Sequence, residues 1–111
     1  MKWNELNDEN QLMAVRERSF QRPQVIFKHS TRCGISSVAK SRLEKWTPSE
    51  DFDFYYLDLI RHRTISNKIA EIFDVYHESP QVLLIKNGRC VYDESHSGIS
   101  MDEIVEKSIA A

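Results

Sequence analysis

The residues best suited to chemistry in this chain surround Cys33, one of its two cysteines. Cys33 lies between a short apolar run and an amphipathic stretch, which predicts that it stands at the start of a helix. The unpaired amide groups and the positive dipole end of a first helical turn favour the thiolate over the thiol. A dithiol redox motif has its second cysteine three residues on, where this chain has Ser36. The pattern therefore predicts thiol–disulfide exchange with a single cysteine.

Positive charge close to Cys33 would lower the pKa of its thiol. Arg32 and His29 are the nearby candidates, although Arg32 is equally well interpreted as an ordinary solvated charge. A free cysteine with a pKa near 8.5 is about 3% thiolate at pH 7. Lowering the pKa to about 6 raises that fraction roughly 30-fold and reduces the nucleophilicity of each thiolate roughly 10- to 20-fold. The larger benefit is that a low-pKa thiol leaves a mixed disulfide readily, and the Ser36 hydroxyl can hydrogen-bond the thiolate.

Composition excludes several classes of partner. The chain has 111 residues and a formal net charge of -2, so no basic field indicates binding to nucleic acid or to an anionic membrane. We expect a single domain over residues 1–111, without a signal peptide or membrane span. Two cysteines are too few for a disulfide-stapled secreted scaffold, which makes a reducing cytoplasm the expected compartment.

Hydrophobic periodicity and turn signals predict an alternation of helices and strands. Asp8 with Gln11 forms a capping box for a first helix that ends near Ser19, and Asn87-Gly88 indicates a hairpin. Strands are expected over residues 25–27, 52–59, 81–86 and 89–93, and the stretch around Trp3 could add a small edge strand. Helices are expected from 33 to before 48, along the apolar stripe 65–76, and from a second capping box at residues 100–103.

This order predicts an α/β fold. Strands that alternate with helices pair in parallel through right-handed crossovers, and the hairpin adds one antiparallel strand. The expected architecture is a mixed central sheet of four to five strands flanked by helices. The aromatic residues of 52–56 and the apolar stripe 65–76 are predicted to fill its core.

The element order resembles the thioredoxin fold over nearly the whole chain. The resemblance rests on Cys33 at the first strand-to-helix junction and on Ser79-Pro80 just before the third main strand. It implies that Pro80 is cis and lies against the active cysteine. It also implies that the backbone of Ser79, beside Pro80, pairs with an extended substrate.

A closer resemblance is to the monothiol bacilliredoxins, the YtxJ family. The residues that carry it are 28–36, 77–81 and the pairs 66–67 and 69–70. The resemblance implies a cytoplasmic enzyme that removes bacillithiol from protein mixed disulfides. It makes Cys33 the nucleophile, and bacillithiol a thiol co-substrate in place of a cofactor or metal. Its partners would be bacillithiolated proteins, bacillithiol and a dithiol redox protein.

The same resemblance assigns supporting roles around the nucleophile. Thr31, Arg32, Gly34 and Ser36 would support Cys33. Proline is common in the family where Gly34 stands here. Glycine makes this turn less rigid and leaves the nucleophile in place.

Two other functions compete with this interpretation. Residues 33–36 differ by one residue from the Cys-Gly-Phe-Ser run of monothiol glutaredoxins, which hold an iron–sulfur cluster between two subunits. Against that alternative, Glu78-Ser79 precedes Pro80 where glutaredoxins have Thr-Val, and their glycine pair and acidic residues are not reproduced at 95–100. The third hypothesis is a thioredoxin-fold adaptor whose thiol is incidental.

The remaining cysteine and the histidines admit simpler interpretations. Cys90 falls on the hairpin strand, where it is either a structural thiol or a distant resolving cysteine. His29 and His77 do not form a common zinc pattern with Cys33. A protease-type cysteine–histidine pair lacks an evident oxyanion loop or orienting residue.

Overall fold

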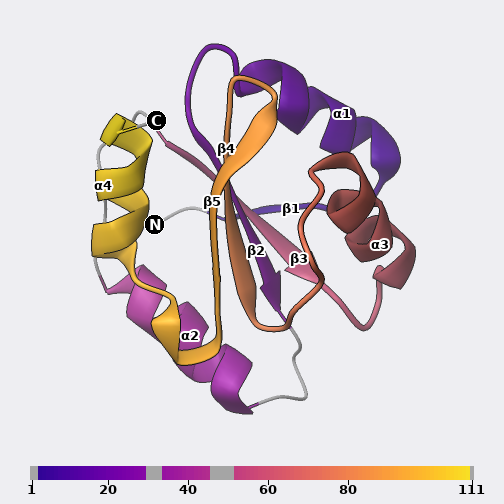
Figure 1. Cartoon of the computed structure of the whole chain (residues 1–111). Helices are drawn as coiled ribbons and strands as arrows, with labels where there is room; N and C mark the ends of the chain where they lie inside the picture. The colour runs from indigo at the N-terminus through magenta and orange to yellow at the C-terminus, as the bar shows by residue number, and fades with distance from the viewer. Residues whose placement is uncertain (1–2, 30–33, 46–51, 111) are drawn as a thin grey trace.

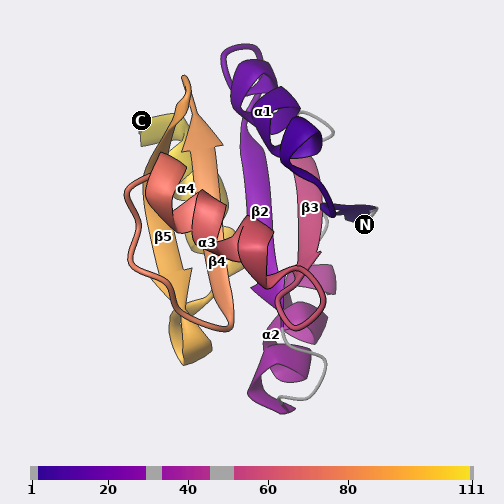
Figure 2. The ribbon, with the colours of Figure 1, turned by 90° about the vertical axis from the view of Figure 1, so that its right-hand side faces the viewer.

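A five-stranded sheet between two layers of helices forms the protein (Figures 1 and 2). The computed structural model describes residues 3–29, 34–45 and 52–110. The strands are β1 (Trp3–Glu5), β2 (Gln24–His29), β3 (Asp53–Asp58), β4 (Gln81–Lys86) and β5 (Arg89–Ser95). The helices are α1 (Glu9–Arg18), α2 (Gly34–Glu44), α3 (Arg63–Ile72) and α4 (Met101–Ala110), with a 3₁₀ turn η1 (His96–Gly98).

The sheet is mixed, as predicted. Its strand order is β1-β3-β2-β4-β5. The strands β1, β3 and β2 run parallel, whereas β4 is antiparallel to β2 and β5 is antiparallel to β4. The predicted α/β architecture is therefore confirmed, and the optional edge strand near Trp3 is present as β1.

Each face of the sheet carries its own apolar core, because every residue of β2 is buried and β4 is buried up to its last residue. The helices α1 and α3 cover one face, which includes Ile26, Leu57 and Leu83. The helices α2 and α4 cover the other face, which includes Val25 and Phe27. Successive residues of a strand point to opposite faces, so the polar side chains of β2 are also divided between the two layers.

Local signals place several element ends. Asp8 caps α1, accepting from the Gln11 amide at 2.8 Å, while the Gln11 side chain accepts from the Asp8 amide at 3.1 Å. The predicted hairpin is present, with φ of 55° at Asn87 and 81° at Gly88. A side chain at Gly88 would also approach the ring of Phe20, at 2.6 Å from the Cβ position.

One core prediction is wrong. The apolar stripe of residues 65–76 was expected to be buried as a whole, yet Tyr76 is 89% exposed. The helix α3 ends at Ile72, and Asp74 adopts a left-handed φ of 53°. Tyr76 therefore no longer follows the helical repeat that placed it on the buried face.

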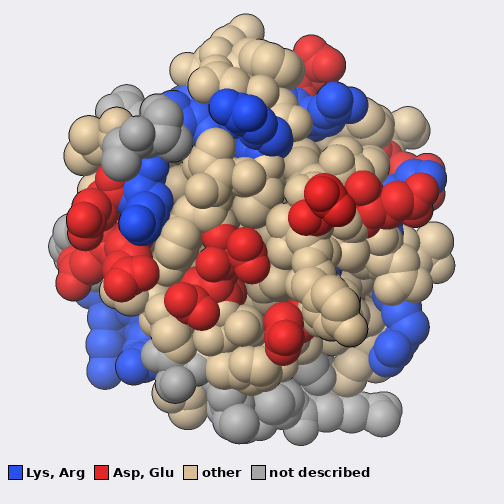
Figure 3. Space-filling model, in the orientation of Figure 1, with Lys and Arg blue, Asp and Glu red and all other residues tan. Residues whose placement is uncertain are grey.

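The surface carries both signs of charge. On the face shown in Figure 3, acidic and basic side chains are interspersed and form no continuous basic field. None of the helices in the described ranges combines the length and apolar character that a membrane crossing requires.

Candidate active site at the carboxyl end of β2

The predicted nucleophile follows β2 in the sequence. β2 ends at His29 and α2 begins at Gly34, so Cys33 directly precedes the helix in the sequence. Thr31, Arg32 and Cys33 lie outside the described residues. Their roles therefore stay predictions.

The predicted helix at this point is present as α2, and its backbone includes two of the supporting residues, Gly34 and Ser36. The helix ends at Glu44, a few residues before the proline expected to end it. The predicted strand-to-helix junction therefore falls between β2 and α2 in the sequence.

Ser79 and Pro80 lie at the same edge of the sheet as the end of β2. The peptide bond between them is cis. The next residue, Gln81, pairs with Lys28 of β2, and the carbonyl of Pro80 accepts a hydrogen bond from the His96 amide at 3.0 Å. Pro80 is buried, as is the Ser79 hydroxyl oxygen, which has no hydrogen-bond partner among the described residues.

The side chain of Gln81 braces the segment that leads to this proline. Its amide nitrogen donates to the carbonyl of Tyr76 at 2.9 Å, and its amide oxygen accepts from the backbone of Glu78 at 3.4 Å. Gln81 itself is fully buried. The backbone from residue 76 to residue 80, which we call the proline loop, is thereby tied to the first residue of β4.

A second brace comes from Lys28, which was not predicted as a site residue from the sequence. Lys28 is 0% exposed, and its ammonium nitrogen lies 3.3 Å from the Ser66 carbonyl and 3.2 Å from His77 Nδ1. The Ser66 hydroxyl is 3.3 Å from the same His77 nitrogen. Three elements, β2, α3 and the proline loop, therefore meet at one buried amine. Its signal in the sequence is a lysine that directly follows the apolar strand run of residues 25–27.

Burial changes the titration of both basic groups in this cluster. It lowers the pKa of Lys28 to about 8, because the charged amine loses its hydration. Burial, followed by the charges of Lys28 and Arg63, lowers the pKa of His77. At neutral pH the favoured state is therefore a charged lysine beside a neutral histidine.

On the opposite face of the sheet, the last residues of β2 pack in an aromatic cluster. The ring of His29 lies 5.6 Å from that of Phe27 and 5.3 Å from that of Tyr56. The ammonium of Lys40, on α2, stands 5.4 Å from the centre of the Tyr56 ring. Trp3 of β1 joins the cluster at 6.4 Å from Tyr56. These contacts connect the edge strand to the helix that follows the predicted nucleophile.

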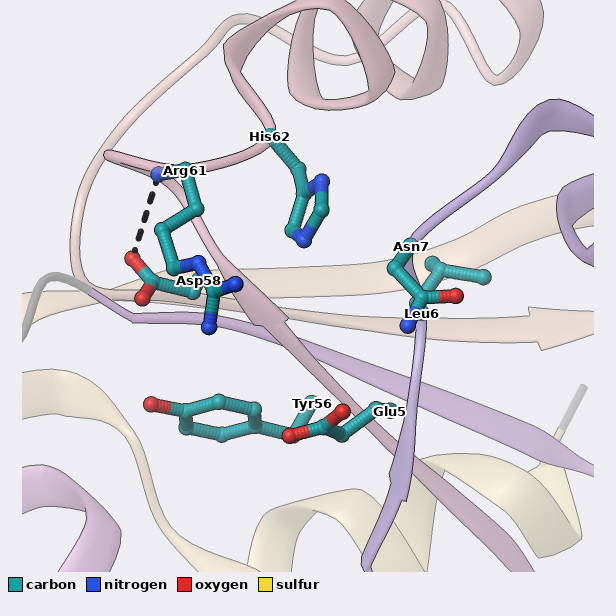
Figure 4. Close-up of a pocket in the computed structure, with 7 residues that line it drawn as sticks. All are labelled: Glu5, Leu6, Asn7, Tyr56, Asp58, Arg61 and His62. Atoms are coloured by element: carbon teal, nitrogen blue, oxygen red, sulfur yellow. Dashed lines mark hydrogen bonds between the residues drawn. The ribbon is translucent and has the colours of Figure 1, made fainter.

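A pocket of about 240 Å³ opens beside the carboxyl ends of β1 and β3 (Figure 4). Its lining residues are Glu5, Leu6, Asn7, Tyr56, Asp58, Arg61 and His62. Asp58 pairs in register with His29, so the pocket adjoins the end of β2. Asp58 also accepts hydrogen bonds from the amides of Ile60 and Arg61, at 3.1 and 3.5 Å. The pocket offers side chains of both charges beside the last residue of β2.

Cys90 lies at the other end of the sheet. It pairs with Ile85, which pairs with Gln24, the first residue of β2. Because five residue steps separate Gln24 from His29, about 16 Å of strand lies between the two ends. Burial, followed by the charge of Asp93, raises the pKa of the Cys90 thiol to about 12, and its sulfur donates to the Tyr92 carbonyl at 3.2 Å. This environment supports the structural interpretation of Cys90.

No group of histidine, cysteine and acidic side chains in the described parts of the chain is arranged to hold a metal ion.

Solved structures with the same arrangement are thioredoxin-fold proteins. A protein described as an oxidoreductase with a thioredoxin fold is 31% identical, with a TM-score of 0.82 over 93% of this chain and 90% of its own. Thioredoxin from Malassezia sympodialis is 20% identical, with a TM-score of 0.78 over 96% and 91% of the two chains. Thioredoxin f from spinach chloroplast is 17% identical, with a TM-score of 0.74 over 98% and 92%. The fold is therefore that of the thioredoxin-like proteins.

A family model identifies the chain more specifically than the fold does. The model described as monothiol bacilliredoxin BrxC matches residues 4–104. The chain belongs to this family, and at the coarse level it is a thiol–disulfide oxidoreductase. The family predicted from residues 28–36 and 77–81 is confirmed.

Proposed function

We propose that this protein removes bacillithiol from protein mixed disulfides by a monothiol mechanism, with Cys33 as the nucleophile. The observation that carries the monothiol part is the location of Cys90, at the end of the sheet opposite to the end of β2. Ser36 stands where a dithiol enzyme has its second cysteine, and a hydroxyl cannot resolve a disulfide. Membership of the monothiol bacilliredoxin family supports bacillithiol as the thiol that is removed.

The reaction then has two exchange steps. The Cys33 thiolate attacks the bacillithiol sulfur of the mixed disulfide, the old S–S bond breaks, and the substrate protein leaves as a thiolate that takes up a proton. A second thiolate, from free bacillithiol or from a dithiol protein, attacks the bacillithiol sulfur on Cys33 and restores the Cys33 thiolate. The oxidised product is bacillithiol disulfide, or the mixed disulfide of the partner. A reducing cytoplasm is the compartment in which we propose that this cycle runs.

The described parts of the site are consistent with a reaction that involves both a protein substrate and a small thiol. Ser79 and Pro80 lie at the carboxyl end of β2, where their backbone can pair with an extended substrate segment. The pocket beside Asp58 has room for the polar part of a low-molecular-weight thiol. Arg61 and His62 offer hydrogen-bond donors there, and Glu5 offers an acceptor.

The experiment that tests the proposal follows the mass of a bacillithiolated substrate protein. Wild-type enzyme with free bacillithiol should return the substrate to its unmodified mass, and Cys90→Ser should do so at the same rate. Cys33→Ser should leave the adduct in place. Release of bacillithiol by Cys33→Ser at the wild-type rate would refute the assignment. A preference for a glutathionylated substrate would refute the bacillithiol part alone.

The iron–sulfur alternative predicts a different observable. Protein purified without oxygen would be brown and would absorb visible light if it carried a cluster. We expect a colourless protein, because the chain belongs to the bacilliredoxin family and not to the glutaredoxins.

A further inference from the structure

Lys28 is a fully buried lysine that has no negatively charged partner in the part of the chain that the structure describes. No carboxylate in the described ranges lies within ion-pair distance of its ammonium. Its hydrogen-bond partners are the carbonyl of Ser66 and the ring of His77, both neutral at the pH where the enzyme is expected to work. Removing an ammonium from water without an ionic partner is costly, and lysine is among the residues that are almost never fully buried unless paired. A lysine in this environment destabilises the fold, and it lies at the carboxyl end of β2, beside the proline loop.

The contact fixes the protonation and the orientation of His77. An ammonium group can only donate, so His77 Nδ1 must accept, and the ring proton is on Nε2. The Ser66 hydroxyl approaches the same nitrogen at 3.3 Å. The His77 residue is exposed, but its Nδ1 atom contacts the buried ammonium of Lys28. It stands two residues before Ser79.

We propose that the buried ammonium of Lys28 is a positioning group for protein substrates, which acts through His77 to hold the Ser79–Pro80 backbone at the carboxyl end of β2. The proposal rests on the proposed function in naming a protein mixed disulfide as the substrate. Lys28 does not contact the reacting atoms in this role. Its effect is confined to substrates that pair with the proline loop.

The charged and titratable groups around this contact define its pH range. They are Lys28 from β2, Arg63 from α3, and His77 and Glu78 from the proline loop, whereas β3 and β4 contribute the uncharged Leu57 and Gln81. Below the lowered pKa of His77, two cations face each other and the hydrogen bond is lost. Above about pH 8, Lys28 loses its proton and the bond loses its charge assistance. The proline loop is held most firmly between these two limits.

The first test compares substrates of different size. Lys28→Met is compared with wild type and with Lys107→Met, a control at an exposed position of α4. With a bacillithiolated protein, we expect Lys28→Met to lower kcat/KM about tenfold, mainly through KM, as for the loss of one charge-assisted hydrogen bond. With a small disulfide such as hydroxyethyl disulfide, and in Cys33 alkylation by iodoacetamide between pH 5 and 9, it should match wild type. Equal losses with both substrates, or no loss with either, would overturn the proposal.

His77 offers a conservative rescue. His77→Asn keeps an acceptor oxygen near the position of Nδ1, whereas His77→Ala removes it. We expect the asparagine variant to retain most of the activity on the protein substrate and the alanine variant to behave like Lys28→Met. Equal activity of the two variants would contradict a role that acts through this hydrogen bond.

A spectroscopic readout separates this proposal from the proposed function. In Lys28→Met, NMR titration of the His77 ring should show its pKa moving up towards the usual range, because a neighbouring cation is gone. Hydrogen exchange at the amides of Glu78 and Ser79 should become faster than in wild type. Both measurements need no substrate, so an enzyme inactive on bacillithiolated proteins would refute the function and leave this test intact. Unchanged His77 titration and unchanged exchange would refute the positioning role.

Discussion

Replacing Lys28 by methionine is expected to make the fold more stable at neutral pH, although it impairs action on protein substrates. Lys28 is fully buried, and burial lowers the pKa of its amine from 10.5 to about 8. Methionine has a similar length, carries no charge and needs no hydration. In the variant the Ser66 hydroxyl is still 3.3 Å from His77 Nδ1, so the nitrogen is not left without a donor, although this hydrogen bond lacks the charge assistance of the ammonium and holds the ring less firmly.

The magnitude follows from the difference between the two pKa values. A shift of one pKa unit corresponds to about 1.4 kcal/mol, so keeping this amine charged in the folded protein at pH 7 costs about 3 kcal/mol. Methionine recovers that cost and loses the hydrogen bonds of the amine, which leaves a gain of about 1–3 kcal/mol. For a domain of this size the melting temperature should rise by about 4–12 °C.

The pH dependence gives the sign of the effect independently. Unfolded lysine keeps its proton up to about pH 10.5, whereas folded Lys28 releases it near pH 8. Between these values the unfolded chain binds more protons, so wild-type stability from this group rises with pH. The advantage of Lys28→Met should therefore shrink from pH 8 upwards and vanish by about pH 10.5.

Urea unfolding at pH 7 and pH 10, with reductant present, measures both quantities. Lys107→Met serves as the control, because it also replaces one lysine by methionine but at an exposed position. A Lys28→Met variant that is less stable than wild type at pH 7 would refute the reasoning. An advantage that stays constant from pH 7 to pH 10 would refute it as well.

Three further predictions concern other parts of the chain. Cys90 should react with iodoacetamide far more slowly than Cys33 at pH 8, as peptide mapping would show, because burial raises the pKa of the Cys90 thiol to about 12. Comparable labelling of both cysteines would contradict that account. Arg61→Gln should raise the KM for free bacillithiol in the second exchange step and leave the first step unchanged in single-turnover assays, if the pocket holds the small thiol. Gly88→Ala should destabilise the fold by about 1–2 kcal/mol, because Gly88 has a φ of 81° and faces the ring of Phe20. The loss should be seen as a lower melting temperature. A variant as stable as wild type would show that the hairpin can relax to accept the added methyl group.

Local signals made most of the fold predictable from the sequence. The capping box of Asp8 with Gln11 and the turn at Asn87-Gly88 each depend on residues that are adjacent or nearly so. The alternation of buried strands and amphipathic helices is likewise a short-range pattern. Tyr76 was predicted wrongly because the apolar repeat continues in the sequence beyond the end of α3 at Ile72, where the backbone turns.

The missed parts of the site depend on long-range pairing. Lys28 and His77 are 49 residues apart, and they meet because β2 pairs with β4 in one particular register. The pocket beside Arg61 needs the pairing of β1 with β3, which the sequence predicted only as an optional edge strand. The distance of Cys90 from the end of β2 follows from the register of the hairpin. No single segment of the sequence contains these relations.

The most direct test of the monothiol account is the mass of the enzyme itself after a single turnover. Wild-type protein is mixed with one equivalent of bacillithiolated substrate, without free thiol, and quenched with acid. The account predicts one bacillithiol adduct on the enzyme, mapped to the peptide that contains Cys33, and an equal amount of freed substrate thiol. An adduct on Cys90, a disulfide between Cys33 and Cys90, or freed substrate without any enzyme adduct would contradict it.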